Sequence, residues 1–376
     1  MFGFCPFCMT DLKIEGNPVA CGCPSCGAIL DEDTYLWQWE HERHHLRVGT
    51  VLKDRYLLGK VKGEGGFGIT YIGRDTHTGR LVAIKEYFPT RCQPQRRDDG
   101  GLYPVSQAEE MYRNGMRSFL QEAGMLAAVV NIPCVVKILD YFEANGTAYM
   151  VMEYLQGETL RQRVERQGTL PFAELMERMR PLLEDMQTMH EAAILHRDIA
   201  PDNIMLLPDG GFKLMDFGCA RFMEDGKSMT VVLKPGFAPP EQYMRRGQGP
   251  FTDVYGLCAT IYYCITGKVP VPSVDRLEND TLQAPSALGA QIDPEAEQVL
   301  LWGLSVQPKA RPQTMRAFLD RLYPAQKPEP IPPRPNPKPH DDTAPWWTRI
   351  PKGNLPLIGI GAAVLAILLI YFVFLS

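Results

Sequence analysis

The chain has 376 residues, of which 45% are hydrophobic and 22% are charged, a composition typical of globular proteins. It carries 39 Lys and Arg against 44 Asp and Glu, a net charge of -5, so no overall basic charge indicates nucleic acid as a partner. Any anionic ligand must therefore be bound by local groups.

The first 30 residues are rich in Cys and Gly and contain two Cys-x-x-Cys units separated by fourteen residues. Each unit places two thiolates on one turn, and two such turns complete the tetrahedral set that structural zinc prefers. The pattern resembles a zinc ribbon over residues 1–30, and Cys21 is an alternative ligand to Cys23. The predicted Zn²⁺ ligands are Cys5, Cys8, Cys23 and Cys26.

Four ligands close a zinc site, so the ribbon is predicted to serve recognition or regulation rather than catalysis. A redox role would need a thioredoxin-like βαβ context, which the short flanks do not provide. The other cysteines are scattered and no signal peptide precedes them, so we expect the bulk of the protein in a reducing cytosol. The linker at 31–50 contains WQWEHERHHLR, whose three histidines are interpreted as part of a solvated segment.

Residues 61–75, VKGEGGFGITYIGRD, contain a Gly-x-Gly-x-x-Gly array between two strand-like runs. Glycine lets backbone amides approach phosphate groups without interference from a Cβ atom. A dinucleotide-binding fold uses the same spacing, but there the glycines lead into a helix. Here they lead into a strand and then into LVAIK, which ends at Lys85, so phosphoryl transfer is the favoured interpretation.

Further motifs follow in order along the chain. The helical run SFLQEAGML contains Glu122, in surroundings typical of a residue that pairs with Lys85. HRDIAPDN at 196–203, DFG at 216–218 and KPGFAPPEQY at 234–243 come next. Six motifs in this order resemble the protein kinase family over about residues 51–322, and most nearly its eukaryotic-like bacterial Ser/Thr kinases.

The resemblance implies an α+β, two-lobed kinase fold at 51–323, sheet-rich to about residue 155 and helical after it. Lys85, held by Glu122, would then neutralise the α- and β-phosphates of ATP. Asn203 and Asp216 would hold Mg²⁺ or Mn²⁺, and Asp198 would accept the proton of the substrate hydroxyl. The nucleotide-binding positions implied are Gly63, Gly65, Gly68, Thr70, Ala83, Lys85, Met152, Glu153, Leu155 and Met205.

Three residues of the helical region have structural roles under the same resemblance. Glu241 ends the activation segment and is expected to pair with Arg311 in PKARP. Asp253 in DVYGL is expected to anchor the backbone of the catalytic loop.

The chain departs from the family pattern at two positions. Ala200 stands where Ser/Thr kinases usually carry Lys, and Lys234 stands where they usually carry Thr. We predict that Lys234 supplies the catalytic ammonium that Ala200 lacks; the alternative is weak activity, with Lys234 a solvated charge. Ser228 and Thr230 are candidate autophosphorylation sites. The long connection at 92–113 is interpreted as an irregular surface insertion, with partner docking as the alternative.

The C-terminal region is predicted to anchor the protein in a membrane. Residues 324–354 form a Pro-rich linker, and the uncharged run 355–375 is long enough to cross a bilayer as one helix. Nearby aromatic and basic residues place the kinase and the ribbon on the cytoplasmic side. Gly359 and Ala363 have the spacing of a helix-packing motif, so a homodimer is an open alternative.

The sequence therefore predicts a cell-membrane, single-pass Ser/Thr protein kinase that uses ATP and a divalent cation and acts on protein substrates. The alternative is a catalytically silent scaffold that recruits partners through the zinc ribbon. Retention of all five motif residues of the phosphoryl-transfer site favours the kinase, because a scaffold does not need all of them. They are Lys85, Glu122, Asp198, Asn203 and Asp216.

Overall fold

The computed structural model describes seven segments, which are residues 3–12, 22–29, 43–128, 132–217, 221–222, 233–244 and 247–324. The predicted membrane segment at 355–375, the linker at 325–354, Cys21, Ser228 and Thr230 lie outside the described residues. Within those seven segments, no helix combines the length and apolar character needed to cross a bilayer.

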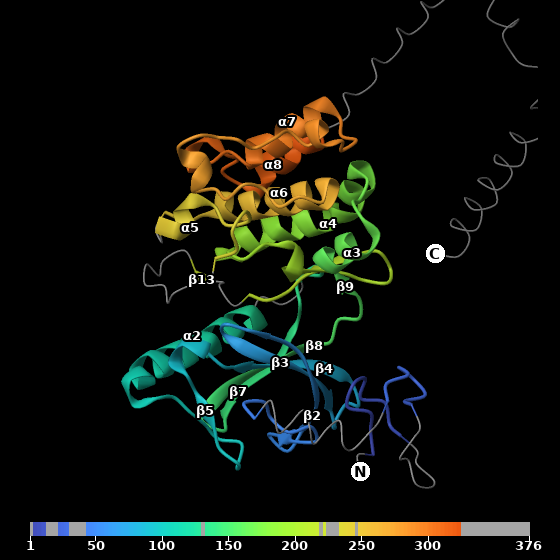
Figure 1. Cartoon of the computed structure of the whole chain (residues 1–376), viewed down its shortest axis with the longest axis vertical. Helices are drawn as coiled ribbons and strands as arrows, with labels where there is room; N and C mark the ends of the chain where they lie inside the picture. Colours follow the sequence, from blue (N-terminus) through green and yellow to red (C-terminus); the bar gives the residue numbers. More distant parts are fainter. Residues whose placement is uncertain are drawn as a thin grey trace, which may run out of the picture. The chain divides into compact units, whose positions relative to one another are not determined.

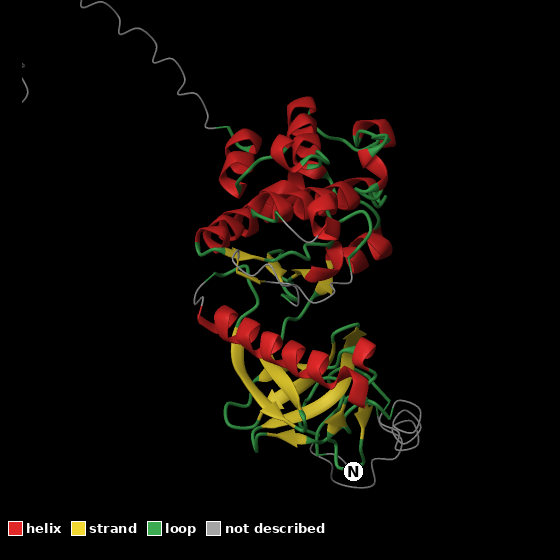
Figure 2. Ribbon diagram, turned by 90° about the vertical axis from the view of Figure 1, so that its left-hand side faces the viewer, coloured by secondary structure: helices red, strands yellow, loops and turns green. Residues whose placement is uncertain are grey.

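The first lobe is built on one antiparallel sheet with the strand order β1-β2-β3-β4-β8-β7, of which Figure 1 labels β2, β3, β4, β7 and β8. Figure 2 shows these strands in yellow, with a long helix against them. In β4, buried Val82 and Ile84 alternate with Ala83 and Lys85, because successive side chains of a strand point to opposite faces. The helix α2 packs against β7 and β8. The bounds are β1 Val51–Leu52, β2 Tyr56–Gly65, β3 Gly68–Asp75, β4 Leu81–Tyr87, α2 Glu109–Ala128, β7 Ile138–Ala144 and β8 Thr147–Glu153.

The second lobe is mainly helical, so the described residues have the two-lobed arrangement expected from the sequence (Figure 2). It begins with β9 Glu158–Thr159, α3 Leu160–Gln167, α4 Phe172–Glu191, β10 Ile194–Leu195, η3 Pro201–Asn203, β11 Ile204–Leu206, β12 Phe212–Leu214 and β13 Arg221–Phe222. It continues with α5 Pro240–Met244, α6 Pro250–Thr266, η4 Asp275–Leu277, η5 Ser286–Leu288, α7 Pro294–Gly303, η6 Pro308–Ala310 and α8 Met315–Leu322.

The helix α6 is buried over most of its length. Most of its residues are apolar, and it packs against α7 and α8. Pro250 occupies its first turn, where no backbone donor is needed. Gly267 ends it with φ 70°, the left-handed conformation that glycine adopts without strain.

The connection between β4 and α2 is an ordered insertion, so the expectation of an irregular one is wrong. It contains η1 Thr90–Cys92, the hairpin of β5 Gln95–Arg96 and β6 Leu102–Tyr103, and η2 Ser106–Ala108. Arg96 Nη2 lies 2.6 Å from Glu86 Oε2, with both side chains buried. The Tyr71 and Tyr149 hydroxyls also donate to Glu86, at 3.0 and 2.8 Å. A buried charge is stable only when it is paired and hydrogen-bonded, and this set of contacts meets that condition.

Residues 3–12 of the cysteine-rich region pack against β2 and β3. Met9 joins a small hydrophobic cluster with Ile72, and the backbone N–H of Lys60 donates to Pro6 O at 2.8 Å. A Cβ atom on Gly59 would lie 2.5 Å from both Met9 Sδ and Pro6 O. Glycine is therefore required here for the close approach of the two parts.

Residues 43–50 also contact the first lobe, so the expectation of a solvated linker is wrong for the buried Leu46, whereas Arg43 and Arg47 are exposed as expected. The Leu46 side chain is buried, and its backbone N–H donates to the Tyr71 hydroxyl at 3.0 Å. Arg96 Nε donates to the carbonyl of His44 at 2.6 Å. Arg96 and Tyr71, which both contact the buried Glu86 carboxylate, therefore also hold residues 44–46 of the linker.

Glu241 on α5 and Arg311 before α8 form a buried bidentate ion pair, which confirms the expected pairing. Nη1 and Nη2 lie 2.7 and 2.8 Å from the two carboxylate oxygens. Arg311 also donates to the carbonyls of Ser305 and Val306. The activation segment is thereby fastened to the C-terminal part of the lobe.

Replacing Arg311 with alanine should lower the free energy of unfolding by about 3–5 kcal/mol, because it leaves the Glu241 carboxylate buried without its cation. Urea unfolding followed by circular dichroism measures the change. Arg316→Ala is the matched control, since its ion pair with Asp320 is exposed and is worth less than about 1 kcal/mol. Equal losses in the two variants would contradict the prediction.

Candidate active site

The hairpin of β2 and β3 carries the glycine array of the sequence. Cβ atoms on Gly63 and Gly65 would meet no atom within 4 Å, whereas one on Gly68 would lie 2.5 Å from Glu86 O. The first two glycines therefore leave open space beside the backbone, and Gly68 allows β3 to approach β4. This arrangement suits backbone amides that contact a phosphate chain.

The predicted adenine-binding residues come from both lobes. Thr70 on β3 lies opposite Lys85 on β4, and Ala83 lies opposite Met152 on β8. Met205 lies on β11 in the helical lobe, opposite Thr159. The pairing of β3, β4 and β8 thus brings Thr70, Ala83 and Met152 close to Lys85 in one sheet.

The chain leaves β8 through Glu153 and Leu155 on its way to the second lobe. The Glu153 carboxylate accepts the Lys137 backbone N–H at 2.9 Å and forms an ion pair with Lys213 on β12. Leu155 is half-buried and packs against the main core. These contacts join the first lobe to the second at the predicted adenine edge.

Lys85 forms an ion pair across the two lobes. Its Nζ lies 2.8 Å from Oδ1 of Asp216, the acidic residue of the DFG triplet. The positive charge of Lys85 holds the pKa of Asp216 below its ordinary value, against the opposing effect of burial. Glu122 lies on α2 and is buried. The predicted phosphate-binding cation and the predicted metal-binding acid are therefore neighbours.

The catalytic loop is anchored by Asp253 of α6, which confirms the structural role expected for that residue. Its fully buried carboxylate accepts the backbone N–H groups of His196 and Arg197 at 2.8 and 2.7 Å. His190 Nε2 lies 2.9 Å from the same carboxylate. Arg197 has φ 65°, which is unusual for a residue with a side chain, so these bonds fix a strained backbone.

Asp198 lies next to this anchor and has two polar partners. Asn203 Nδ2 donates to Asp198 Oδ2 at 2.8 Å, and Lys234 Nζ lies 3.2 Å from the same oxygen. Burial raises the pKa of Asp198 above its ordinary value, while the charge of Lys234 acts in the opposite direction. Because the Asn203 nitrogen points to Asp198, its carbonyl oxygen is the atom that could serve as a metal ligand.

A small cavity lies beside the Asp198 carboxylate. Its lining includes Arg197, Lys234 and Gln242 together with the α6 residue Gly256. Ala200 is fully buried nearby at the start of η3. The Lys234 ammonium thus lies at the Asp198 carboxylate, in the loop that also contains Ala200.

Two supporting residues of the loop were not identified from the sequence. Gln242 Nε2 donates to the Arg197 carbonyl at 2.5 Å, and His190 contacts Asp253. Gln242 directly follows Glu241 in PPEQY, and this place next to a motif could have indicated a supporting role. No sequence pattern indicates such a role for His190, which lies near the end of an ordinary amphipathic helix.

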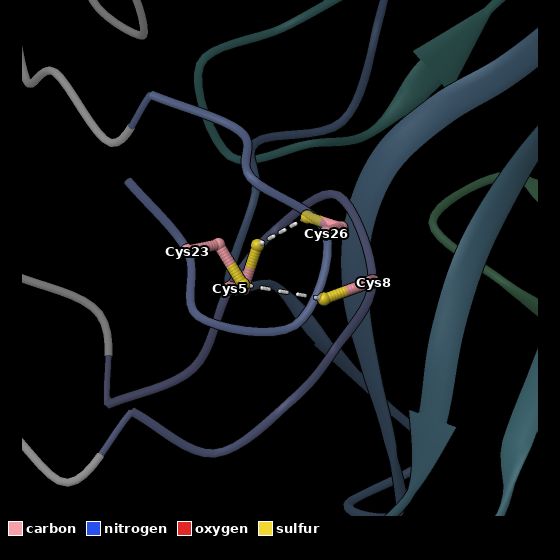
Figure 3. Close-up of side chains that lie close together, drawn as sticks. All are labelled: Cys5, Cys8, Cys23 and Cys26. Atoms are coloured by element: carbon pink, nitrogen blue, oxygen red, sulfur yellow. Dashed lines mark hydrogen bonds between the residues drawn. The ribbon is translucent and has the colours of Figure 1, made fainter. Parts of the chain in front are cut away.

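The four predicted zinc ligands come together in the structure (Figure 3). Their sulfur atoms all lie within 4.8 Å of one another, with Cys5 3.7 Å from Cys26 and Cys8 3.6 Å from Cys23. Burial raises the pKa of the Cys5 thiol to about 12. Burial acts in the same direction on Cys8, but hydrogen bonding with Thr10 and the neighbouring thiols outweighs it and lowers the pKa of Cys8 to about 6.

Four sulfur donors at this spacing fit a tetrahedral ion with Zn–S bonds of about 2.3 Å. The turns that carry them are alike, since Met9 N–H donates to Cys5 O and Gly27 N–H donates to Cys23 O. The donor set therefore fits a structural zinc site in its chemistry and in the spacing of its sulfur atoms.

Comparison with known proteins gives a consistent result. The model of the protein kinase domain matches residues 56–323. "Serine/threonine-protein kinase PknB" of Mycobacterium leprae (strain TN) is 32% identical over 296 residues, which is 74% of this chain and 44% of that protein. "Probable serine/threonine-protein kinase SCO3848" of Streptomyces coelicolor is 33% identical, covering 70% of this chain and 38% of the relative. The chain thus spans less than half the length of these curated relatives.

A solved structure gives the same result for the fold. "PpkA-294 apo form" is 34% identical with a TM-score of 0.66, and the match covers 74% of this chain and 99% of that one.

Proposed function

The chain belongs to the protein kinase family, with eukaryotic-like bacterial Ser/Thr kinases among its relatives, and on this premise we propose that it transfers the γ-phosphate of ATP to protein Ser or Thr hydroxyls. The observation that carries the proposal is the meeting of Asp198, Asn203 and Lys234 beside the Lys85–Asp216 ion pair. Phosphoryl transfer depends mainly on positioning and charge stabilisation, and these groups can supply both.

Each group has a defined task in this proposal. Asp198 orients the substrate hydroxyl and accepts its proton, and its partners hold the carboxylate in one orientation. Lys85 neutralises the α- and β-phosphates, and Glu122 on α2 is proposed to hold it. Asp216 and the Asn203 carbonyl would hold a divalent cation, whose chemistry is to neutralise phosphate charge.

The glycine hairpin and the strands around it are proposed to bind the nucleotide. Gly63, Gly65 and Gly68 would present amides to the phosphates, and Thr70 would lie above the adenine. Ala83 and Met205 are proposed to enclose the ring from the two lobes. Met152, Glu153 and Leu155 would then form its edge.

Lys234 is proposed to replace the lysine that the family carries at the position of Ala200. Its ammonium is already within 3.2 Å of the Asp198 carboxylate, so it can stabilise the transferring phosphate from the activation segment. Loss of one such group costs several kcal/mol at the transfer step, which is why an uncompensated alanine would leave little activity.

Two further proposals concern the ends of the chain. Cys5, Cys8, Cys23 and Cys26 would bind structural Zn²⁺, which would hold the two cysteine turns together on β2 and β3. Residues 355–375 would anchor the kinase in the cell membrane, with the catalytic lobes and the ribbon in the cytoplasm. Homodimerisation through Gly359 and Ala363 is a weaker alternative within the second proposal.

Incubation of the full chain with ATP and Mg²⁺ should add phosphates that mass spectrometry detects and that Asp198→Asn abolishes.

Lys234→Thr should slow transfer at least about 100-fold, because it removes transition-state stabilisation. The lost charge should also raise the pKa of Asp198, so the acid limb of the remaining activity should move to higher pH. Ala200→Lys, added to Lys234→Thr, should restore part of the rate.

The matched control is Lys268→Thr, an exposed lysine outside the site, which should leave transfer unchanged. Full activity in Lys234→Thr would refute the proposal that Lys234 replaces the lysine missing at position 200. A chain that binds nucleotide but gains no phosphate would instead favour the silent scaffold. Mapping the phosphates would also test Ser228 and Thr230.

The zinc proposal is tested with Co²⁺ in place of Zn²⁺. The full chain should show intense thiolate-to-cobalt absorption, and Cys26→Ser should weaken it because one of four sulfur ligands is lost. Cys134→Ser, which changes a cysteine far from the cluster in sequence, should leave the absorption intact. Absorption that is absent, or that persists undiminished in Cys26→Ser, would rule out the proposed ligand set.

The membrane proposal predicts that the full chain stays with membranes after an alkaline carbonate wash. A chain without residues 355–375 should be released, because about 20 apolar residues are needed to cross the bilayer core. Release of the full chain by the wash would show that these residues are no anchor.

A further inference from the structure

A second group of metal-ligating side chains lies on the glycine hairpin. His44 Nε2 is 3.1 Å from each carboxylate oxygen of Glu64, and His45 Nε2 is 2.9 Å from Glu64 Oε2. All three ligand atoms lie within 4.8 Å of one another. Glu64 stands between Gly63 and Gly65, so this cluster joins the segment that follows the ribbon to the proposed phosphate-binding hairpin.

The spacing suits a bound ion. Ligand atoms about 2.0–2.1 Å from a tetrahedral ion lie about 3.3 Å apart, close to the distances in the cluster. Both imidazole rings direct Nε2 towards Glu64 Oε2. The three ligand atoms therefore converge on one point, as a metal site requires.

The backbone that carries the two histidines is fixed before any ion binds. Arg96 Nε donates to His44 O at 2.6 Å, and the Leu46 N–H donates to the Tyr71 hydroxyl at 3.0 Å. The Phe88 ring lies 5.6 Å from the His44 ring and covers part of the site. The His45 side chain is 11% exposed, against 38% for His44 and 35% for Glu64, so an ion can enter from one side. The ion would therefore bind to a backbone that these hydrogen bonds have already ordered.

The donor set selects the kind of ion. Two imidazole nitrogens and one carboxylate suit Zn²⁺ and neighbouring transition metals, whereas Mg²⁺ prefers oxygen ligands. Three protein ligands leave one coordination position open to solvent. The site should therefore bind its ion less tightly than a closed four-cysteine site and exchange it more readily.

We propose that His44, His45 and Glu64 form a transition-metal site, separate from the cysteine cluster, that fastens the glycine hairpin to residues 43–50. The turn of the hairpin is already braced, since Phe88 N–H donates to Phe67 O and Thr90 N–H donates to Gly66 O. A bound ion restrains Glu64 as well. Hairpin motion and metal occupancy are then coupled.

The coupling rests on the proposed nucleotide site, because only then do the amides of the hairpin contact phosphates. Metal binding should shift the nucleotide dissociation constant at least about fivefold, and nucleotide should shift the metal affinity by the same factor. The metal site itself does not depend on that function. The two ideas can therefore fail separately.

The test uses the full chain, first loaded with Zn²⁺ and dialysed so that the cysteine cluster is filled, and then titrated with Co²⁺. Optical spectra should show a weak d–d absorption without thiolate charge transfer, while calorimetry gives the stoichiometry. His45→Ala and Glu64→Gln should each abolish this event. His77→Ala, which changes an exposed histidine on the neighbouring β3–β4 turn, should retain it.

Absence of the event, or its persistence in both His45→Ala and Glu64→Gln, would overturn the metal site. Binding of a fluorescent ATP analogue, measured with and without Co²⁺ in each variant, tests the coupling. A Co²⁺-dependent shift of the nucleotide dissociation constant that is present in the parent and absent in Glu64→Gln supports the coupling. Equal nucleotide affinities with and without Co²⁺ in the parent would overturn the coupling. A chain that binds no nucleotide would refute the proposed function, while the Co²⁺ titration would still decide the metal site.

Discussion

The geometry of the candidate active site depends on one buried carboxylate, that of Asp253. It accepts two consecutive backbone N–H groups of the catalytic loop and so holds Arg197 in a conformation that is uncommon for a residue with a side chain. Asp198 follows directly, and Asn203 and Lys234 converge on it. An unpaired carboxylate at this depth would be very costly, so the loop and α6 stabilise each other.

The first lobe has a comparable centre at Glu86. The Arg96 guanidinium and the two tyrosine hydroxyls surround its carboxylate, and Arg96 in turn binds the carbonyl of His44. One strand, the inserted hairpin and the segment after the ribbon therefore meet at one polar group. A buried ion pair adds little net stability over apolar packing. In this chain it determines how the N-terminal segments lie relative to the glycine hairpin.

Under the proposed function, the catalytic cation is carried by the activation segment, through Lys234, instead of by the catalytic loop at position 200. A lysine at position 200 would sit in the loop that Asp253 anchors, whereas Lys234 belongs to the activation segment. That segment is held at its far end by the Glu241–Arg311 pair. The catalytic cation would then reach Asp198 only when the segment is folded, which links chemistry to the state of the segment.

The sequence by itself determined the family and the two-lobed fold, because the motifs are short, ordered and tied to backbone requirements of glycine, buried apolar runs and single charged residues. It also gave the Glu241–Arg311 and Asp253 contacts, since the family pattern carries them. It does not predict the contacts of His44 and His45 with Glu64 or the hairpin within the insertion. Their environment depends on Glu64, Glu86 and Tyr71, which lie far away along the chain. Only tertiary packing decides such contacts, because local periodicity does not record which distant charge a side chain will meet.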